Sequence, residues 1–451
     1  MHGKIIKGKI MKQKNIIFYF SDQQRWDTVN NQVTPNLMQL ANEGVMFENN
    51  FTCQPVCGPA RACLQSGLYA TQIGCYWNGI PLPDGTPSLA HYFNNAGYQT
   101  AYIGKWHLAS DRLPGIGMHC EATAIPKERL GEYQYFRGAD VLEFTSHGYD
   151  GFIFDENGTK INFTGYRADC INDYATEYIE KRDKDKPFFM FISQLEPHHQ
   201  NDHHCYEGFK ETIDDYKNYP LPDDLTFMKG DYKEMYPDYM SAINRLDYNV
   251  GRLVQKLKDE GIYDDTIIIY TSDHGSHFKT RNLEYKRSCH ESATHTPLII
   301  KGGEFVGGKR ETRLSSLIDI PPTLMAMAGI DIPKQYMGID LAKQVTGEEP
   351  PRKNVFIQVS EASNSRAIRT DKYKYSIRDA SPCGYIHAKA KVYFEDYLYD
   401  LEKDPIEKHN LIKNKAYAEV REELKQQLID EMMNAGEDKP VIMPAIKARK
   451  I

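Results

Sequence analysis

The sequence predicts an α/β fold with a mostly parallel central sheet flanked by helices, followed by a smaller C-terminal α+β domain. Between residues 15 and 330, short apolar segments alternate with amphipathic segments of helical period. Strands that alternate with helices in this way run parallel in one sheet, with helices on both faces. After residue 353 the apolar segments become short and frequent, which is typical of antiparallel strands. We therefore divide the 451 residues into a basic N-terminal extension over 1–14, a main domain over 15–340 and a subdomain over 341–451.

The strands and helices of the main domain follow from apolar periodicity and from glycines, which often end helices. The segments expected as buried strands are 15–20, 98–103, 187–192, 266–271 and 297–300. The segments expected as helices are 35–43, 59–65, 88–95, 168–181, 239–260 and 317–328. Residues 198–236 lack a regular period, as do residues 110–165, which we expect to run over the surface and to line a cleft.

The C-terminal part has a different pattern. Residues 331–353 combine glycine, proline and charge and are expected to be a linker. Beyond it, strands are expected at 355–359, 366–369, 373–377 and 392–398, and a helix near 416–433. Ligands of parallel sheets bind at the carboxyl ends of the strands, so polar residues just after the predicted strands are candidates for a site. These candidates are Asp22, Gln23, Lys105, His107, His198, Asp273 and His274.

Bulk composition excludes several classes of protein. The formal net charge is −7, and no broad basic excess favours nucleic acid as a partner. No stretch approaches the ~20 apolar residues of a membrane span, and the apolar run at 16–20 is too short for a signal peptide. We therefore expect no membrane partner and a cytoplasmic location, with Met11 as an alternative start to Met1. The nine cysteines show no compact framework, so we expect reduced thiols.

The segment Cys57-Gly-Pro-Ala-Arg61 lies directly before a short predicted helix. A cysteine at a helix N-terminus has its thiolate favoured by the helix dipole, and Arg61 would add positive charge that could hold an oxyanion. The ordinary alternative is a buried structural cysteine. The pattern Cys-x-Pro-x-Arg, followed by Leu64 and Gly67, resembles the signature of the formylglycine-dependent sulfatases, a family of the alkaline phosphatase superfamily.

Further segments resemble the same family, in the same order, along nearly the whole chain. They are the second signature at 97–108, the late metal-binding turn at 271–275, the lysine segment at 286–297, the closing helix at 316–329 and a C-terminal stretch at 398–411. The resemblance implies an alkaline-phosphatase-like fold in which residues 15–340 form the catalytic domain.

The resemblance also implies a mechanism. In this family a maturation enzyme oxidises the signature cysteine to formylglycine, whose hydrated aldehyde supplies the hydroxyl that attacks a sulfate ester. Arg61 and Lys105 would then stabilise charge on the nucleophile, and His198 and Lys286 would stabilise and protonate the leaving oxygen. His107 would take a proton from the remaining hydroxyl, so that sulfate leaves and the aldehyde re-forms. On a continuing strand, Lys105 and His107 would point the same way.

A divalent-metal site is the next implication of the resemblance. Its expected ligands are Asp22, Gln23, Cys57, Asp273 and His274, and carboxylate and amide oxygens suit Ca²⁺. Gln23 and His274 depart from the commonest family pattern, which has an acidic residue and an asparagine at these places. An imidazole ligand favours transition metals, so Mn²⁺, Mg²⁺ and Zn²⁺ stay open. Taken alone, either aspartate would be interpreted as the cap of a turn or helix.

A second group of metal-binding residue types lies between residues 198 and 205. Its members are His198, His199, His203, His204 and Cys205. Such residues could bind zinc, and a solvated polar loop is the ordinary alternative. The family resemblance favours a third role for His198, because the Pro-His segment of the family contacts the sulfate.

Three functions stay open at this point. The first is hydrolysis of a sulfated carbohydrate or another small sulfate ester. The second is hydrolysis of a phosphonate monoester or phosphodiester at the same site, which Gln23 and His274 keep open. The third is a catalytically silent binding protein, against which the complete set of candidate catalytic residues argues.

Overall fold

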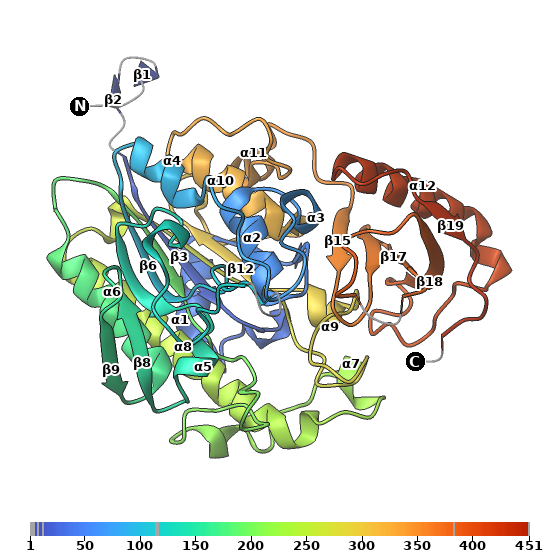
Figure 1. The fold of residues 1–451 in the computed structure, drawn as a ribbon, viewed down its shortest axis with the longest axis horizontal. Helices are drawn as coiled ribbons and strands as arrows, with labels where there is room; N and C mark the ends of the chain where they lie inside the picture. The colour runs from blue at the N-terminus through green and yellow to red at the C-terminus, as the bar shows by residue number, and fades with distance from the viewer. Residues whose placement is uncertain (1–4, 7–8, 11–12, 113–116, 382–383, 450–451) are drawn as a thin grey trace.

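The main domain is built around a 10-stranded sheet, and a separate 5-stranded sheet lies beside it in Figure 1. The computed structural model describes residues 5–6, 9–10, 13–112, 117–381 and 384–449. The order across the large sheet is β13 (Lys309–Glu311), β4 (Val45–Phe47), β12 (Leu298–Lys301), β11 (Thr266–Ser272), β3 (Asn15–Ser21), β10 (Phe188–Ser193), β6 (Gln99–Lys105), β7 (Tyr135–Ala139), β8 (Asp150–Asp155) and β9 (Lys160–Thr164). Only β12 and β8 run opposite to the other strands of this sheet, which confirms the predicted, mostly parallel arrangement.

The central strand β3 packs against helices on both of its faces. Its side chains alternate, so Ile16, Phe18 and Phe20 join one apolar core while Ile17 and Tyr19 join another. The first core is covered by α2 (Cys57–Ser66), α4 (Leu89–Asn95) and α10 (Ile320–Met327). The second is covered by α1 (Pro35–Glu43), α6 (Arg167–Lys181) and α8 (Tyr232–Asp259). This two-sided burial explains why β3 is almost entirely apolar.

The C-terminal strands form the smaller sheet, drawn in orange to red in Figure 1. Its order is β15 (Val355–Val359), β16 (Ser365–Arg369), β17 (Tyr373–Arg378), β18 (Val392–Asp400) and β19 (Val441–Met443). The first four strands pair antiparallel, as predicted, and α12 (Ala418–Asn434) packs on them. The sequence pattern did not indicate β19, or α11 (Leu341–Thr346) inside the expected linker. The boundary between 340 and 341 stays a prediction.

The prediction that residues 110–165 run over the surface is wrong for the second half of this segment. There β7, β8 and β9 extend the central sheet, with α5 (Leu142–Thr145) between the first two. The pairing of β7 with β6 requires glycine, which does not contribute to an apolar sequence pattern. A Cβ on Gly138 of β7 would lie 2.0 Å from the carbonyl oxygen of Gly104 in β6, so only glycine fits there. Helix α8 also begins seven residues earlier than the expected 239, at Tyr232.

The remaining α-helices and strands are short. They are β1 (Ile5–Ile6), β2 (Lys9–Ile10), β5 (Asn50–Phe51), β14 (Ser315–Ser316), α3 (Ala70–Ile73), α7 (Asp223–Thr226) and α9 (Glu291–Thr294). Both candidate start residues, Met1 and Met11, lie outside the described residues. Within the described part of the chain, every cysteine is a free thiol, and no helix is long and apolar enough to cross a membrane.

Candidate active site

Two aspartates meet where neighbouring parallel strands end. Strands β3 and β11 pair in register from end to end, with Ser21 opposite Ser272. Asp22 and Asp273 directly follow these serines and are fully buried. The backbone of Gln23, which has a left-handed φ of 72°, donates a hydrogen bond of 2.9 Å to Asp273 Oδ1. Pairing of the two strands therefore brings both carboxylates to one point at the sheet edge.

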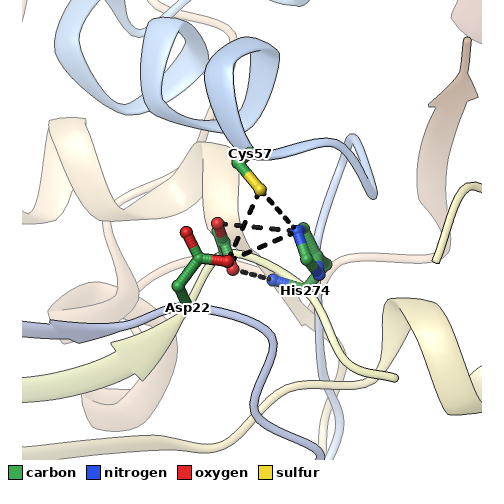
Figure 2. Close-up of side chains that lie close together, drawn as sticks. Asp22, Cys57 and His274 are labelled. Atoms are coloured by element: carbon green, nitrogen blue, oxygen red, sulfur yellow. Dashed lines mark hydrogen bonds and ion pairs between the residues drawn. The ribbon is translucent and has the colours of Figure 1, made fainter. Parts of the chain in front are cut away.

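Cys57 and His274 complete this group, as Figure 2 shows. The Cys57 sulfur, on the first residue of α2, lies 3.4 Å from Asp22 Oδ1 and 3.2 Å from His274 Nε2. One ligating atom from each of Asp22, Cys57, Asp273 and His274 lies within 4.8 Å of all the others. Asp273 Oδ2 is buried without a hydrogen-bond partner among the described residues, although it lies 3.6 Å from His274 Nε2. A buried carboxylate oxygen without a hydrogen-bond partner is available to bind a divalent cation, so the four side chains fit a metal site.

Gln23 lies at the edge of the same group. Its side-chain nitrogen donates to Tyr206 at 2.7 Å and to Ser276 at 3.3 Å. These bonds to two hydroxyl groups hold the Gln23 side chain in place, and Gln23 lines the cavity beside Cys57. Its role as a metal ligand stays a prediction.

Positive side chains surround Asp22. Arg61 Nη2 and Lys105 Nζ each lie 3.0 Å from Asp22 Oδ2, and all three side chains are buried. Burial opposes ionisation of Asp22, but the charges of Lys105, Lys286 and Arg61 together hold the pKa of this carboxyl well below its usual range. The buried Asp22 carboxylate is therefore ionised, and it holds the side chains of Arg61 and Lys105 beside it.

The Cys57 thiol is not activated as a thiolate. Burial, and then the charge of Asp22, raise the pKa of Cys57 to about 12, although Lys286 and Lys105 act in the opposite direction. The expectation that the helix dipole would favour the thiolate is therefore wrong, because desolvation outweighs it. An unmodified Cys57 would be a poor nucleophile at neutral pH.

Lys286 and His198 line the same cavity as Cys57. Lys286 Nζ lies 2.8 Å from the Cys57 sulfur and 3.0 Å from His198 Nε2. Burial, then Lys286 and Lys105, lower the pKa of His198 well below its usual value. Neutral His198 therefore accepts a hydrogen bond from Lys286.

His107 reaches the cavity by a different route from the one expected. Strand β6 ends at Lys105, and His107 has a left-handed φ of 58°. The expectation that both side chains point the same way along one continuing strand is therefore wrong. Asp140 holds the turn in place by accepting backbone hydrogen bonds of 2.8–2.9 Å from Leu108, Ala109 and Ser110. Burial, then Lys105 and Arg61, lower the pKa of His107, so its imidazole is neutral.

Two family models match this chain. The model described as Sulfatase matches residues 14–330, and one described as N-sulphoglucosamine sulphohydrolase, C-terminal, matches residues 282–434. The chain belongs to the sulfatase family. It is thus a sulfuric ester hydrolase, and the family implies a divalent metal and a formylglycine.

Relatives of this sulfatase match over almost its whole length. The Uncharacterized sulfatase YidJ of Escherichia coli (strain K12) is 30% identical over 94% of this chain and 88% of its own. An N-acetylglucosamine-6-O-sulfatase of Bacteroides thetaiotaomicron is 27% identical over 95% of this chain and 87% of its own. A solved structure of a protein in complex with its substrate, D-glucosamine-2-N,6-O-disulfate, has a TM-score of 0.76 and 24% identity, and covers 95% of this chain and 99% of its own. The last comparison shows a shared fold.

The sulfatase cavity contains residues that the sequence pattern did not single out. It measures about 300 Å³ and is lined by Gln23, Cys57, Asn78, His107, Glu143, His198, Asn201, Glu284, Tyr285, Lys286 and Arg287. Glu143 Oε2 lies 3.0 Å from Lys105 Nζ, and Asn78 accepts a 2.8 Å hydrogen bond from the backbone of Gly58. No sequence motif marked Glu143 as a site residue, because it lies in the segment 110–165 that was expected to be irregular.

The histidines of residues 198–205 separate in the sulfatase. His198 faces Lys286, whereas His199 Nε2 lies 2.9 Å from the Tyr285 hydroxyl. His203 pairs with Glu207 instead. Among the described residues, the five side chains do not gather on one point, so the zinc alternative for that set is wrong.

Proposed function

We propose that this sulfatase hydrolyses the sulfate ester of a carbohydrate or another small alcohol, with a formylglycine made from Cys57 as the nucleophile. The observation that carries the proposal is the position of Cys57. Its sulfur lies against Asp22 and His274 on one side and against Lys286 on the other. A nucleophile at this position lies between a cation site and a proton donor. Hydrolysis of a sulfate ester uses the cation at the sulfate oxygens and the proton donor at the leaving alcohol oxygen.

The proposed metal is Ca²⁺, held by Asp22, Asp273, His274, the side chain at position 57 and the amide oxygen of Gln23. The buried Asp273 Oδ2, which has no hydrogen-bond partner among the described residues, supports this ligand set. Oxygen atoms dominate the set, which suits Ca²⁺, and the ion would act as a Lewis acid on the sulfate oxygens. Activity after removal of metal and addition of Ca²⁺, Mg²⁺, Mn²⁺ or Zn²⁺ in turn tests the identity of the ion.

Each side chain of the cavity has a proposed task. Arg61 and Lys105 neutralise negative charge near the nucleophile, since both lie 3.0 Å from Asp22 and stay charged when buried. Lys286 Nζ–H donates the proton to the leaving oxygen, and His198 orients it by accepting a second Nζ–H. His107 is neutral and can therefore take a proton from the hydroxyl at position 57.

A sulfated carbohydrate is the proposed class of substrate. One curated relative is named for N-acetylglucosamine 6-O-sulfate, and one solved relative holds a sulfated glucosamine. The cavity of about 300 Å³ is at the lower end of sizes for small-molecule sites and is lined mostly by polar groups. These properties fit a single sugar ring that carries its sulfate inward.

The test begins with coexpression of the chain and a formylglycine-generating enzyme. Mass spectrometry of the peptide containing Cys57 should show sulfur and two hydrogens replaced by one oxygen. The Cys57→Ala variant should lose arylsulfate hydrolysis, while Cys63→Ala, which changes another buried thiol of α2, should keep it. A Cys57 that stays a thiol in an active enzyme would contradict the proposal.

Phosphonate monoester or phosphodiester hydrolysis is the second candidate, favoured by an imidazole at His274 next to the cation site. Initial rates with a sulfate and a phosphate diester of the same nitrophenol separate the two functions. We expect the sulfate to be the better substrate, and a higher kcat/KM for the diester would reverse the assignment.

A further inference from the structure

A second group of metal-binding side chains lies outside the catalytic cavity. It consists of His147, Asp202 and His203, whose ligating atoms all lie within 4.8 Å of one another. None of the three lines the cavity or belongs to the Asp22 group. His147 follows α5, and the other two lie on the loop after β10, so residues far apart in the chain build the group.

The distances within this group are close to those around a zinc ion. His147 Nε2 lies 2.8 Å from Asp202 Oδ2. Two ligands of a tetrahedral zinc with bonds of about 2.0 Å lie roughly 3.3 Å apart, so a small outward movement would admit the ion between them. The His203 ring stacks on the His147 ring, with a centroid distance of 4.0 Å and an interplanar angle of 10°. One ring would have to rotate for both to direct a nitrogen at the same ion. Two imidazoles and one carboxylate form a donor set typical of zinc sites that keep a water ligand.

Outer partners already orient two of these three ligands. His203 Nδ1 lies 2.7 Å from Glu207 Oε1, which leaves His203 Nε2 for an ion. Gln200 donates a 2.8 Å hydrogen bond to Asp202 Oδ1, which leaves Asp202 Oδ2 facing His147. Histidine ligands in metal sites characteristically donate their second nitrogen to a carboxylate in this way. Glu207 Oε2 is buried and has no hydrogen-bond partner among the described residues.

A buried arginine holds the two loops together before any ion binds. Arg167 Nη1 donates to the carbonyl oxygen of Ser146 at 3.1 Å and to Gln200 Oε1 at 3.3 Å. Its Nε is bonded to the buried Glu196 at 2.9 Å. Ser146 precedes His147, and Gln200 bonds Asp202, so Arg167 fixes the neighbours of two ligands. The loops need little ordering when an ion binds, which favours affinity.

We propose that His147, Asp202 and His203 bind Zn²⁺ as a second metal site, with Glu207 supporting His203. The site lies beside the catalytic cavity, because the same loop carries Asn201, which lines that cavity. A bound ion would link the loop that carries Asn201, Asp202 and His203 to the turn at residues 146–150. The three side chains are partly exposed, so the ion could enter from solvent.

The experiment uses the matured enzyme with its catalytic site saturated with Ca²⁺. Zinc is titrated calorimetrically into the wild type and into the His147→Ala/His203→Ala double variant. We expect the wild type to bind one more zinc per chain than the double variant. Glu207→Gln, which keeps all three ligands, should weaken this zinc by about 10–100-fold.

A matched control is His91→Ala. His91 forms an exposed pair with Glu132 at 3.0 Å but belongs to no metal-binding group among the described residues, so its loss should leave zinc binding unchanged. Equal zinc stoichiometry in the wild type and the double variant would overturn the proposal. A Glu207→Gln variant that binds zinc as tightly as the wild type would do so too, and circular dichroism of each variant checks its fold. The readout is the difference in zinc binding between proteins that share the same catalytic site, so neither result depends on the proposed nucleophile.

Discussion

Lys286 Nζ lies 3.0 Å from His198 Nε2 and 2.8 Å from the Cys57 sulfur. The ammonium group therefore bridges the position of the nucleophile and a neutral imidazole. This arrangement allows one N–H of Lys286 to point at His198 while another faces a substrate. In the proposed mechanism Lys286 is the proton donor and His198 orients it, whereas Arg61 and Lys105 form ion pairs with Asp22.

Lys286→Ala should reduce kcat by about 10²–10⁴-fold for an alkyl sulfate, because general acid catalysis contributes this much when a leaving group needs a proton. The loss should be smaller for nitrophenyl sulfate, whose leaving group departs without protonation. The measurement is kcat for both esters in the variant and in Lys279→Ala, a control whose side chain is partly exposed and paired with Asp231. Equal losses with both esters would contradict the role in proton donation.

Metal affinity should depend on pH through Asp273. Burial, and then the charge of Asp22, raise the pKa of Asp273 to about 7 when no ion is present. Below that pH an ion must displace a proton, so the apparent affinity should fall about tenfold per pH unit, and above it the affinity should level off. Calcium titrations between about pH 5.5 and 8.5 measure this midpoint. An affinity that does not change over this range would contradict the prediction.

Lys374 should be essential for stability. It is fully buried in β17, and its Nζ lies 2.6 Å from Glu291 and 2.7 Å from Glu407. Lys374→Ala would remove the ion pair of the buried Glu407 and leave Glu291 only its longer contacts with Arg369 and His295, each at 3.5 Å. It should lower the free energy of unfolding by about 3–5 kcal/mol. Lys372→Ala, which removes an exposed pair with Glu402, should change this free energy little. Chemical denaturation of both variants makes the comparison, and similar midpoints would contradict it.

Gly104 should tolerate no side chain. A Cβ at this position would lie 1.8 Å from the carbonyl oxygen of Ser193, where β6 and β10 pair. Gly104→Ala should therefore force the strands apart, cost at least ~1–3 kcal/mol and displace Lys105. Gly97→Ala is the control, since its φ is also positive but no atom lies within 4 Å of the new Cβ. Thermal melting of both variants tests the difference, and equal shifts would show that φ alone matters.

Strands that are buried on both faces were predictable. Strands β3 and β11 are continuous apolar runs, because parallel strands between two layers of helices have no polar face. The polar residues after them, Asp22 and Asp273, were therefore recognisable as site candidates. By contrast, β8 and β9 at the sheet edge have mixed exposure, so no local pattern distinguishes them from a loop.

The sequence by itself determined the main buried strands and the long helices, the family resemblance and the candidate catalytic residues, because short motifs and apolar periods are local properties of the chain. The tertiary structure decided which residues meet. Lys286 reaches Cys57 across 229 positions, Glu143 reaches Lys105, and His203 lies against His147 rather than His198. The structure also reversed the expected ionisation of Cys57. Contacts between distant segments, and the desolvation that accompanies them, arise only when the sheet and its loops are assembled.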